Sequence, residues 1–128
     1  MEKLKCIGIL FVIGLCFSCS VHEKTQEQEA QNLNQLYSEI KNLATSENCN
    51  DATTWTFTPY GNKVCGGPVG YIAYSTTIDT ELFLETVAQH RTAEKAFNEK
   101  WGMVGPCNVP PQPTGISCED GHPVLEYR

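Results

Sequence analysis

The chain has no apolar run long enough to cross a membrane, and it has few basic side chains. Its longest uncharged apolar stretch, residues 6–17, has 12 residues, whereas a bilayer-spanning helix needs about 20. Lys and Arg together number 9, against 15 Asp and Glu. This acidic balance argues against a protein that binds nucleic acid and against electrostatic attachment to anionic lipid.

The sequence also lacks the ligand pairs of zinc sites and the common catalytic motifs. From Cys49 onward, successive cysteines are 16, 42 and 11 positions apart, and His22, His90 and His122 are scattered. Zinc sites in proteins use closely spaced ligands such as Cys-x-x-Cys or His-x-x-x-His. The sequence contains no His-Glu-x-x-His, no Gly-x-Ser-x-Gly and no phosphate-binding glycine loop. We therefore expect no metal, no cofactor and no enzymatic activity.

The N-terminus carries the features of an export signal. Two lysines precede the apolar run, whose length suits a secretory signal peptide. Leu15 and Ser18 then precede Cys19 in a loose form of the bacterial lipobox, which is similar to the lipoprotein signals of Bacteroidota. We predict a lipoprotein signal peptide over residues 1–18, lipidation of Cys19, and anchoring in the bacterial envelope, at the outer membrane or on the periplasmic face. A plain cleaved signal is the alternative.

Export changes the interpretation of the seven cysteines. Two of them leave with the signal peptide and Cys19 carries the lipid, so four remain: Cys49, Cys65, Cys107 and Cys118. An even number of cysteines in an exported chain indicates a disulfide framework, for which three pairings are possible. We expect Cys49 to pair with Cys65 and Cys107 with Cys118, because each pair closes a short loop. The other pairings join segments across the second predicted helix.

The mature chain divides into a tether and a domain. Residues 19–32 are polar and rich in Gln and Glu, a composition that buries too little apolar surface to order itself, so we predict a flexible tether. Residues 33–128 are long enough for a single globular domain.

Two helices are predicted from apolar periodicity. Leu33, Leu36 and Ile40 begin a stripe at helical spacing, within a helix over about residues 27–44. A second helix begins after Asp79, which can cap it, and ends near Gly102. His90 lies on the apolar stripe of the second helix, and we interpret it as a packed, hydrogen-bonded core residue.

Short strands are predicted over residues 53–58 and 71–74, and Asp120-Gly121 predicts a type I′ hairpin turn near the C-terminus. The fold class is therefore α+β: a small disulfide-stabilised domain with two amphipathic helices packed on short antiparallel strands and a hairpin. We expect five large aromatic residues to form one core between the strands and the second helix: Trp55, Phe57, Phe83, Phe97 and Trp101.

A proline-rich segment is the candidate binding loop. It consists of Asn108, Val109, Pro110, Pro111, Gln112, Pro113 and Thr114. Prolines stiffen it, and a bridge between Cys107 and Cys118 would bracket it, so little conformational entropy would be lost on binding. A connector that merely closes the fold has the same composition. An inhibitory loop of the kind that blocks proteases also has this physical character.

A pattern of cysteine, glycine, proline and aromatic residues in this chain resembles the pattern of a group of small secreted or lipid-anchored bacterial proteins of unknown function. The resemblance covers about residues 49–125 and rests on Cys49, Trp55, Gly61, Lys63, residues 65–68 and 70–76, Ile78, Asp79, Phe97, Asn98, residues 100–102, Cys107, Val109, Pro110, Pro113, Gly115, Cys118 and Gly121. It implies a location and a fold, and it implies no reaction and no catalytic residues. We therefore expect a cell-envelope lipoprotein that binds a protein or peptide partner. The alternative is a structural or stress-related lipoprotein without a dedicated ligand.

The anchor can be tested directly. A Cys19→Ala variant should leave the membrane fraction and should lose labelling by a fatty-acid analogue, because it lacks the thiol that carries the lipid. Fractionation and labelling of cells that express each form measure both effects. Persistent labelling of the variant would rule out lipidation at Cys19, whereas a plain signal peptide predicts that the unaltered protein is already soluble after export.

Overall fold

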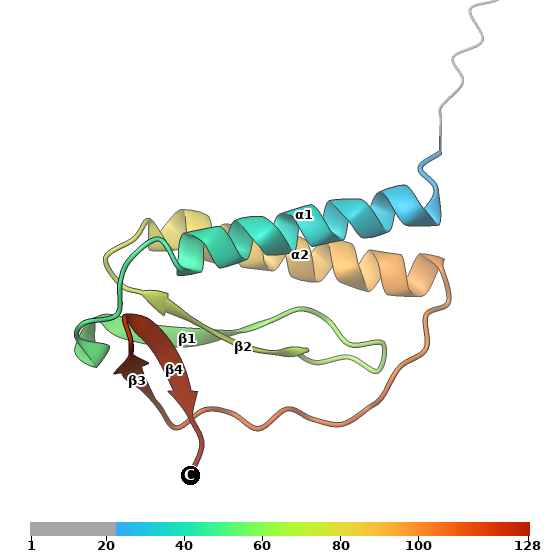
Figure 1. Cartoon of the computed structure of the whole chain (residues 1–128). Coiled ribbons are helices and arrows are strands. Elements are labelled where there is room, and N and C mark those ends of the chain that lie inside the picture. Colours follow the sequence, from blue (N-terminus) through green and yellow to red (C-terminus); the bar gives the residue numbers. More distant parts are fainter. Residues whose placement is uncertain (1–22) are drawn as a thin grey trace, which may run out of the picture.

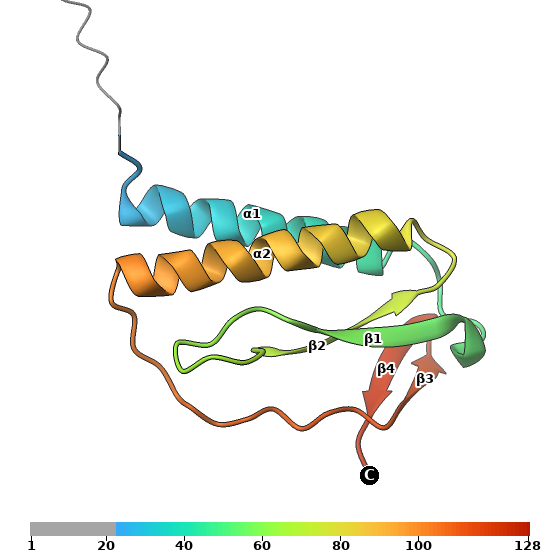
Figure 2. The same ribbon diagram turned by 180° about the vertical axis from the view of Figure 1, so that it is seen from behind.

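Two helices lie side by side over one face of a two-stranded sheet, and a second hairpin lies under one end of that sheet (Figure 1; Figure 2). This computed structural model describes residues 23–128, so the predicted signal peptide and the lipidation site lie outside the described residues. The elements in chain order are α1 (Gln26–Ala44), the 3-10 helix η1 (Ala52–Thr54), β1 (Trp55–Tyr60), β2 (Gly70–Ser75), α2 (Thr80–Lys100), β3 (Gly115–Glu119) and β4 (His122–Glu126). The predicted α+β class is confirmed.

Helix α1 begins at Gln26, close to the predicted start at about residue 27, so residues 26–32, which we also assigned to a flexible tether, are helical. A capping box stabilises this end of the helix. The Thr25 hydroxyl accepts a hydrogen bond from the backbone N–H of Gln28, and the Gln28 side chain accepts one from the backbone N–H of Thr25. Composition alone was a wrong guide here, because capping satisfies backbone donors without burying any apolar surface.

The first turn of α1 is also bound to the last turn of α2. The Glu29 carboxylate accepts hydrogen bonds from Lys100 Nζ (2.7 Å) and from Trp101 Nε1 (2.8 Å). Both hydrogen bonds lower the pKa of the Glu29 carboxyl below its ordinary value, and the bond from Lys100 has the larger effect. Glu29 is 71 residues from Lys100 and 72 residues from Trp101 in the sequence. These contacts can therefore order the polar start of α1 only after the two helices have paired.

The bounds of α2 follow the prediction. Asp79 is the N-cap, and its carboxylate accepts a hydrogen bond from the backbone N–H of Leu82 (3.0 Å). After the C-cap residue Trp101, Gly102 has a φ of +56°, a conformation in which glycine is favoured.

Strands β1 and β2 form the middle layer of the molecule. They pair antiparallel from Trp55 opposite Ser75 to Tyr60 opposite Gly70. Successive side chains of a strand point to opposite faces of the sheet. Tyr60, Ile72 and Tyr74 contact the helical layer, where the buried cluster consists of Ile40, Ala44, Tyr74, Phe83 and Val87.

The other face of this sheet packs against the second hairpin. Asp120 and Gly121 at its turn have φ values of 51° and 78°, so the predicted turn with two left-handed residues is confirmed. A second buried cluster forms here from Cys49, Trp55 and Ala73, with Ile116, Cys118 and Leu125 packed against it.

The prediction of one aromatic core is therefore wrong. Trp55 belongs to the second cluster, on the side of the sheet away from the helices, and only Phe83 of the five is buried among the helices. Phe57 is half-buried and makes an edge contact with Tyr71, with 6.0 Å between ring centroids. Alternation along β1 explains the difference, because Trp55 and Phe57 point to the face that the helices do not cover.

Both disulfides are present, but the predicted pairing is wrong. Cys49 is bonded to Cys118 and Cys65 to Cys107, with Cα–Cα distances of 5.3 and 5.6 Å. The second hairpin folds back beneath the start of β1, where the backbone N–H of Cys49 donates to the carbonyl of Gly121 (2.8 Å). Since the bonded residues are 69 and 42 positions apart, each bridge restrains the unfolded chain by about 4 kcal/mol in the chain-entropy model.

The packing of the helical layer predicts a contrast between two neighbouring residues of α2. Phe83 is fully buried, whereas Leu84 is 41% exposed. Phe83→Ala should lower the free energy of unfolding by about 3–5 kcal/mol, because it leaves a cavity in the core. Leu84→Ala should change it by less than about 1 kcal/mol. Urea denaturation of both variants measures the difference, and equal losses would contradict this description of the core.

Candidate functional site

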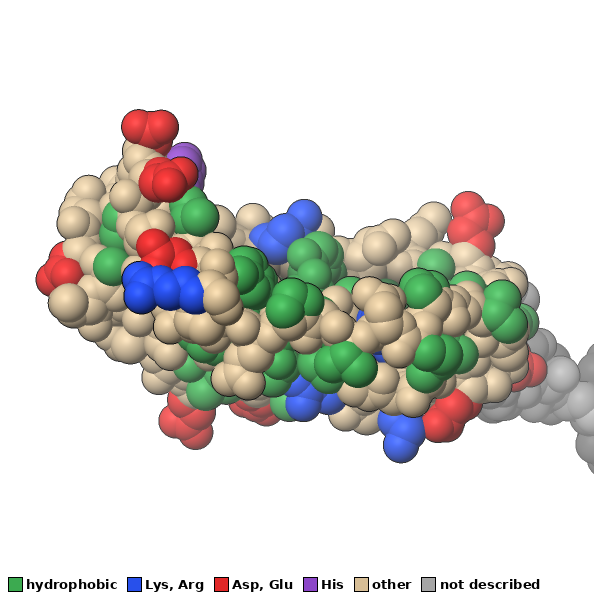
Figure 3. All heavy atoms as spheres, turned by 90° about the horizontal axis from the view of Figure 1, so that it is seen from below, with side chains coloured by type: hydrophobic (Ala, Val, Ile, Leu, Met, Phe, Trp, Pro, Cys, Tyr) green, Lys and Arg blue, Asp and Glu red, His purple; other side chains and the backbone are tan. Residues whose placement is uncertain are grey.

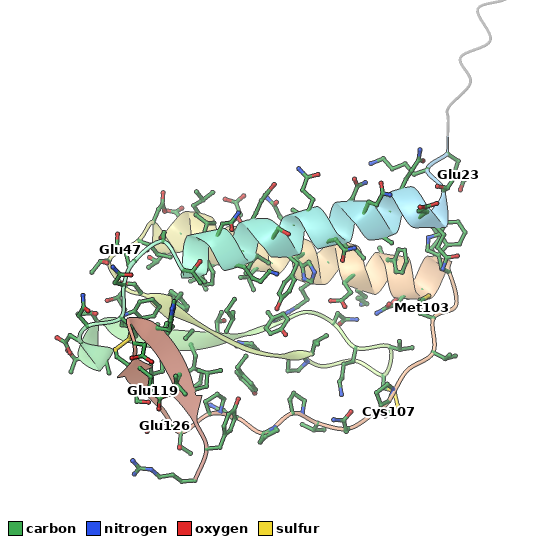
Figure 4. The ribbon with its side chains drawn as sticks, viewed as in Figure 1. Glu23, Glu47, Met103, Cys107, Glu119 and Glu126 are labelled. Carbon is green, nitrogen blue, oxygen red and sulfur yellow. A yellow bond between two sulfur atoms is a disulfide. The ribbon has the colours of Figure 1, made fainter. Side chains whose placement is uncertain are left out.

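The predicted binding loop forms part of a longer extended segment, residues 103–114, which we call the connector. It runs from Met103, shortly after α2, past Cys107, and beneath the first sheet to β3 (Figure 4). Among the described residues, no backbone–backbone hydrogen bond joins positions 104–113 to another segment. Prolines at four of these ten positions explain this in part, since proline has no backbone donor.

The connector is nevertheless fixed at several points. Cys107 is bonded to Cys65 in the loop between β1 and β2, and Lys63 Nζ from the same loop donates to the carbonyl oxygen and to Oδ1 of Asn108. At the far end, the backbone N–H of Thr114 donates to the carbonyl of Glu126 (2.8 Å). The predicted ring closed by Cys107 and Cys118 does not exist. The segment is instead tied at its two ends to different parts of the fold.

The predicted loop residues differ in exposure. Pro113 is buried and Pro110 is half-buried, so these two prolines pack against the domain. Val109 is 85% exposed, and Val104, which the prediction did not include, is 90% exposed. Seen from below, apolar side chains follow one another along most of this face (Figure 3). Asn108, Pro111, Gln112 and Thr114 are also exposed.

A second feature, which we call the helix–sheet groove, lies between α1, α2 and the end of β1. Its volume is about 350 Å³. Four of its lining residues can form polar contacts through an aromatic or charged side chain: Tyr37, Tyr60, His90 and Glu94. The others are Ala30, Leu33, Asn34, Val69 and Phe97.

His90 and Glu94 lie one helical turn apart on the floor of this groove. His90 is only 6% exposed, and its Nδ1 has no hydrogen-bond partner among the described residues. The nearest carboxylate oxygen, Glu94 Oε2, is 3.8 Å from Nδ1, which is too far for a direct hydrogen bond. Glu94 Oε2 is held in place by the backbone N–H of Asn62, which donates to it over 2.8 Å. His90 is therefore packed as predicted, but its Nδ1 is not hydrogen-bonded.

Two stacked tyrosines form the wall of the groove. The rings of Tyr37 and Tyr60 lie 5.4 Å apart at 21°, and the Tyr37 ring also lies 5.8 Å from that of His90. Burial is the main cause that raises the pKa of Tyr60 to about 12, and the neighbouring Tyr37 is the second cause. Burial lowers the pKa of His90 below its ordinary value, against the opposing effect of Glu94. Tyr60 and His90 are therefore both uncharged at neutral pH.

The groove combines an apolar lining with groups that can donate or accept hydrogen bonds. The lining residues include a carboxylate, an imidazole and two phenols, but no serine or cysteine nucleophile. All four cysteines of the described chain are in disulfides, so none supplies a thiolate. Sequence reasoning missed Tyr37, Tyr60 and Glu94 as site residues. The available signal was the i, i+4 spacing of His90 and Glu94 beside an aromatic-rich stripe.

Comparisons of the chain with protein-family models, with curated proteins and with solved structures give no match. Within residues 23–128, no helix has both the length and the apolar character needed to cross a bilayer. The same residues contain no cluster of three or more His, Cys, Asp or Glu side chains placed to hold a metal ion.

The burial of His90 predicts a pH dependence of stability. Because its pKa is lower in the folded than in the unfolded chain, the unfolded chain binds the proton first as the pH falls. The free energy of unfolding should therefore decrease as the pH falls through 6.5, the ordinary His value. The groups that face His90 are Tyr37 from α1, Tyr60 from β1 and Glu94 on α2.

Urea unfolding at several pH values from about 7.5 to 5.5 measures this dependence. A His90→Phe variant, which keeps a ring at the position but cannot be protonated, should show a smaller slope. His122→Gln is the matched control, because His122 is exposed. A slope that is unchanged in His90→Phe, or that is lost in His122→Gln, would assign the effect to other groups.

Proposed function

We propose that this protein is a lipid-anchored module of the bacterial cell envelope that binds an extended segment of a protein or peptide and catalyses no reaction. One observation carries this proposal: the connector presents exposed apolar side chains on a backbone that is already extended and fixed. Val104 and Val109 are 90% and 85% exposed, and Val64, beside the Cys65–Cys107 bridge, is 42% exposed.

Fixation of the connector lowers the cost of binding. A segment that is ordered before it meets its partner loses less conformational entropy on association. The Cys65–Cys107 bridge, the bonds from Lys63 to Asn108 and the packing of Pro113 all restrict the connector. Between these points, the backbone N–H and C=O groups of Val109 and Gln112 make no backbone–backbone hydrogen bond in the described chain and can pair with an extended peptide.

The proposed anchor would hold this surface close to the membrane. Only residues 20–25 separate Cys19 from the first residue of α1, so the helix begins no more than about 25 Å along the chain from the lipid. The start of α1 and the start of the connector lie at the same end of the molecule (Figure 2). A partner in the same membrane, or close to its surface, is therefore within reach of Val104.

Two other functions are separable by experiment. A structural or stress-related lipoprotein would have no partner that depends on the connector. An inhibitor-like protein would have a protease as its partner. The half-buried Pro110 and the buried Pro113 favour a docking surface over an inhibitory loop, because their packing holds the connector against the domain instead of letting it project into the cleft of a protease.

Substitution of the two exposed valines tests the proposal. Val104→Asp and Val109→Asp together should abolish capture of a stoichiometric partner from solubilised envelope, because each places a charge at an apolar contact. Crosslinking followed by affinity purification under mild detergent measures the partner. The substituted side chains are solvent-exposed, so the melting temperature should change little.

Leu82→Asp is the matched control, since Leu82 is an exposed apolar residue (48%) on α2 rather than on the connector. The control should retain the partner. Equal loss of the partner in both proteins, or equal retention, would contradict binding through the connector. A protease as the captured partner would support the inhibitory function instead.

A further inference from the structure

The helix–sheet groove is a second candidate site, separate from the connector and independent of the function proposed for it. Its lining comes from α1, α2, the end of β1 and the loop that follows β1, and includes no residue of the connector. Most of its surface is apolar or aromatic, and Glu94 is its single formally charged lining residue. Small-molecule sites commonly combine an apolar lining with a few polar groups in this way.

One buried polar atom of the groove, His90 Nδ1, lacks a hydrogen-bond partner among the described residues. Buried side-chain nitrogens are nearly always hydrogen-bonded, and an orphaned one costs stability. His90 Nδ1 is buried without a partner among the described residues, although Glu94 Oε2 lies 3.8 Å away. At this separation, one donor atom can lie at about 2.9 Å from both Nδ1 and Oε2. Such an atom would need to donate two hydrogen bonds.

The charges of the groove favour a cation as that donor. Glu94 is negative and no lining residue is positive, so an ammonium group would be electrostatically favoured and a carboxylate would be repelled. The rings of Tyr37 and Tyr60 add faces that attract cations. Lys41 Nζ lies over the Tyr37 ring, 4.9 Å from its centroid, so this ring already holds one cation of the chain itself.

The apolar residues of the groove fit the remainder of such a ligand. Leu33, Val69 and Phe97 line the groove beside the polar pair and can contact a short alkyl stem. We propose that the helix–sheet groove binds a primary alkylammonium group, with the ammonium between His90 and Glu94 and the stem against these three residues. A free alkylamine and the side chain of a lysine in a partner peptide share this chemistry.

A chemical-shift titration with a matched set of ligands tests the proposal. The mature lipoprotein in detergent, with ¹⁵N-labelled histidine, is titrated at neutral pH with n-pentylamine, 1-pentanol and pentanoate, which have the same stem. Pentylamine should shift the His90 ring resonances in a saturable manner, and the other two should bind at least about tenfold more weakly. Equal binding of pentanol, or no saturable shift with pentylamine, would overturn the proposal and indicate a groove that holds only water.

Variants of two carboxylates distinguish a site from a nonspecific effect. Glu94→Gln removes the charge but retains an oxygen that can accept the bond from Asn62, so the fold should persist. Its affinity for pentylamine should fall at least about tenfold. Glu85→Gln, on an exposed position of α2, should bind as the unaltered protein does. Unchanged affinity in Glu94→Gln, or equal loss in both variants, would contradict the proposed site.

A second variant covers the case in which Glu94→Gln fails to fold. Val69 lines the groove and is 40% exposed, so Val69→Lys can supply an ammonium group from the chain itself and should abolish pentylamine binding. Retained binding in Val69→Lys would overturn the proposal. To distinguish the two ligand sources, a lysine peptide is compared with its Nε-acetylated form. Selective binding of the unmodified peptide indicates a lysine side chain, and binding of pentylamine alone indicates a free amine.

Discussion

The structure depends on a two-stranded sheet that carries apolar side chains on both of its faces. An isolated pair of strands is at best marginally stable, so each face needs a cover. Tyr60 and Tyr74 pack against the helices, while Trp55 and Ala73 pack against the second hairpin. The two buried clusters are therefore separated by the sheet. Neither the helices nor the hairpin could bury its own apolar face without it.

The second hairpin is short, and this has consequences for the surface. Strands β3 and β4 have five residues each, so they cover only one end of the sheet. Beneath the rest runs the connector, whose prolines reduce its capacity to pair as a further strand. The Cys65–Cys107 bridge holds it near the loop between β1 and β2 instead. An extended segment with exposed valines is thus a direct result of how this chain completes its fold.

The interface between the helices and the sheet is not uniformly apolar. Near the ends of α1 and β2, where Ile40, Phe83 and Tyr74 meet, the interface is buried and apolar. Farther along α2, His90 and Glu94 replace apolar residues, and the layers enclose a groove instead of a core. Burial of an unpartnered imidazole nitrogen is costly and gives no packing advantage over a leucine. This cost is the physical reason to treat the groove as a site and not as an imperfectly filled interior.

The sequence by itself determined the features that depend on a few neighbouring residues. Apolar spacing, the Asp79 cap and the Asp120-Gly121 turn specified both helices and the C-terminal hairpin, because capping and turn energies are local. Tertiary structure alone decided the disulfide pairing, since Cys49 meets Cys118 only when the hairpin folds back beneath β1. It also separated Trp55 from Phe83 and brought Tyr37 and Tyr60 to His90. These outcomes depend on which faces of the helices, the sheet and the hairpin pack against each other. That arrangement is set by the combined packing of segments far apart in the chain, so a local sequence pattern cannot predict it.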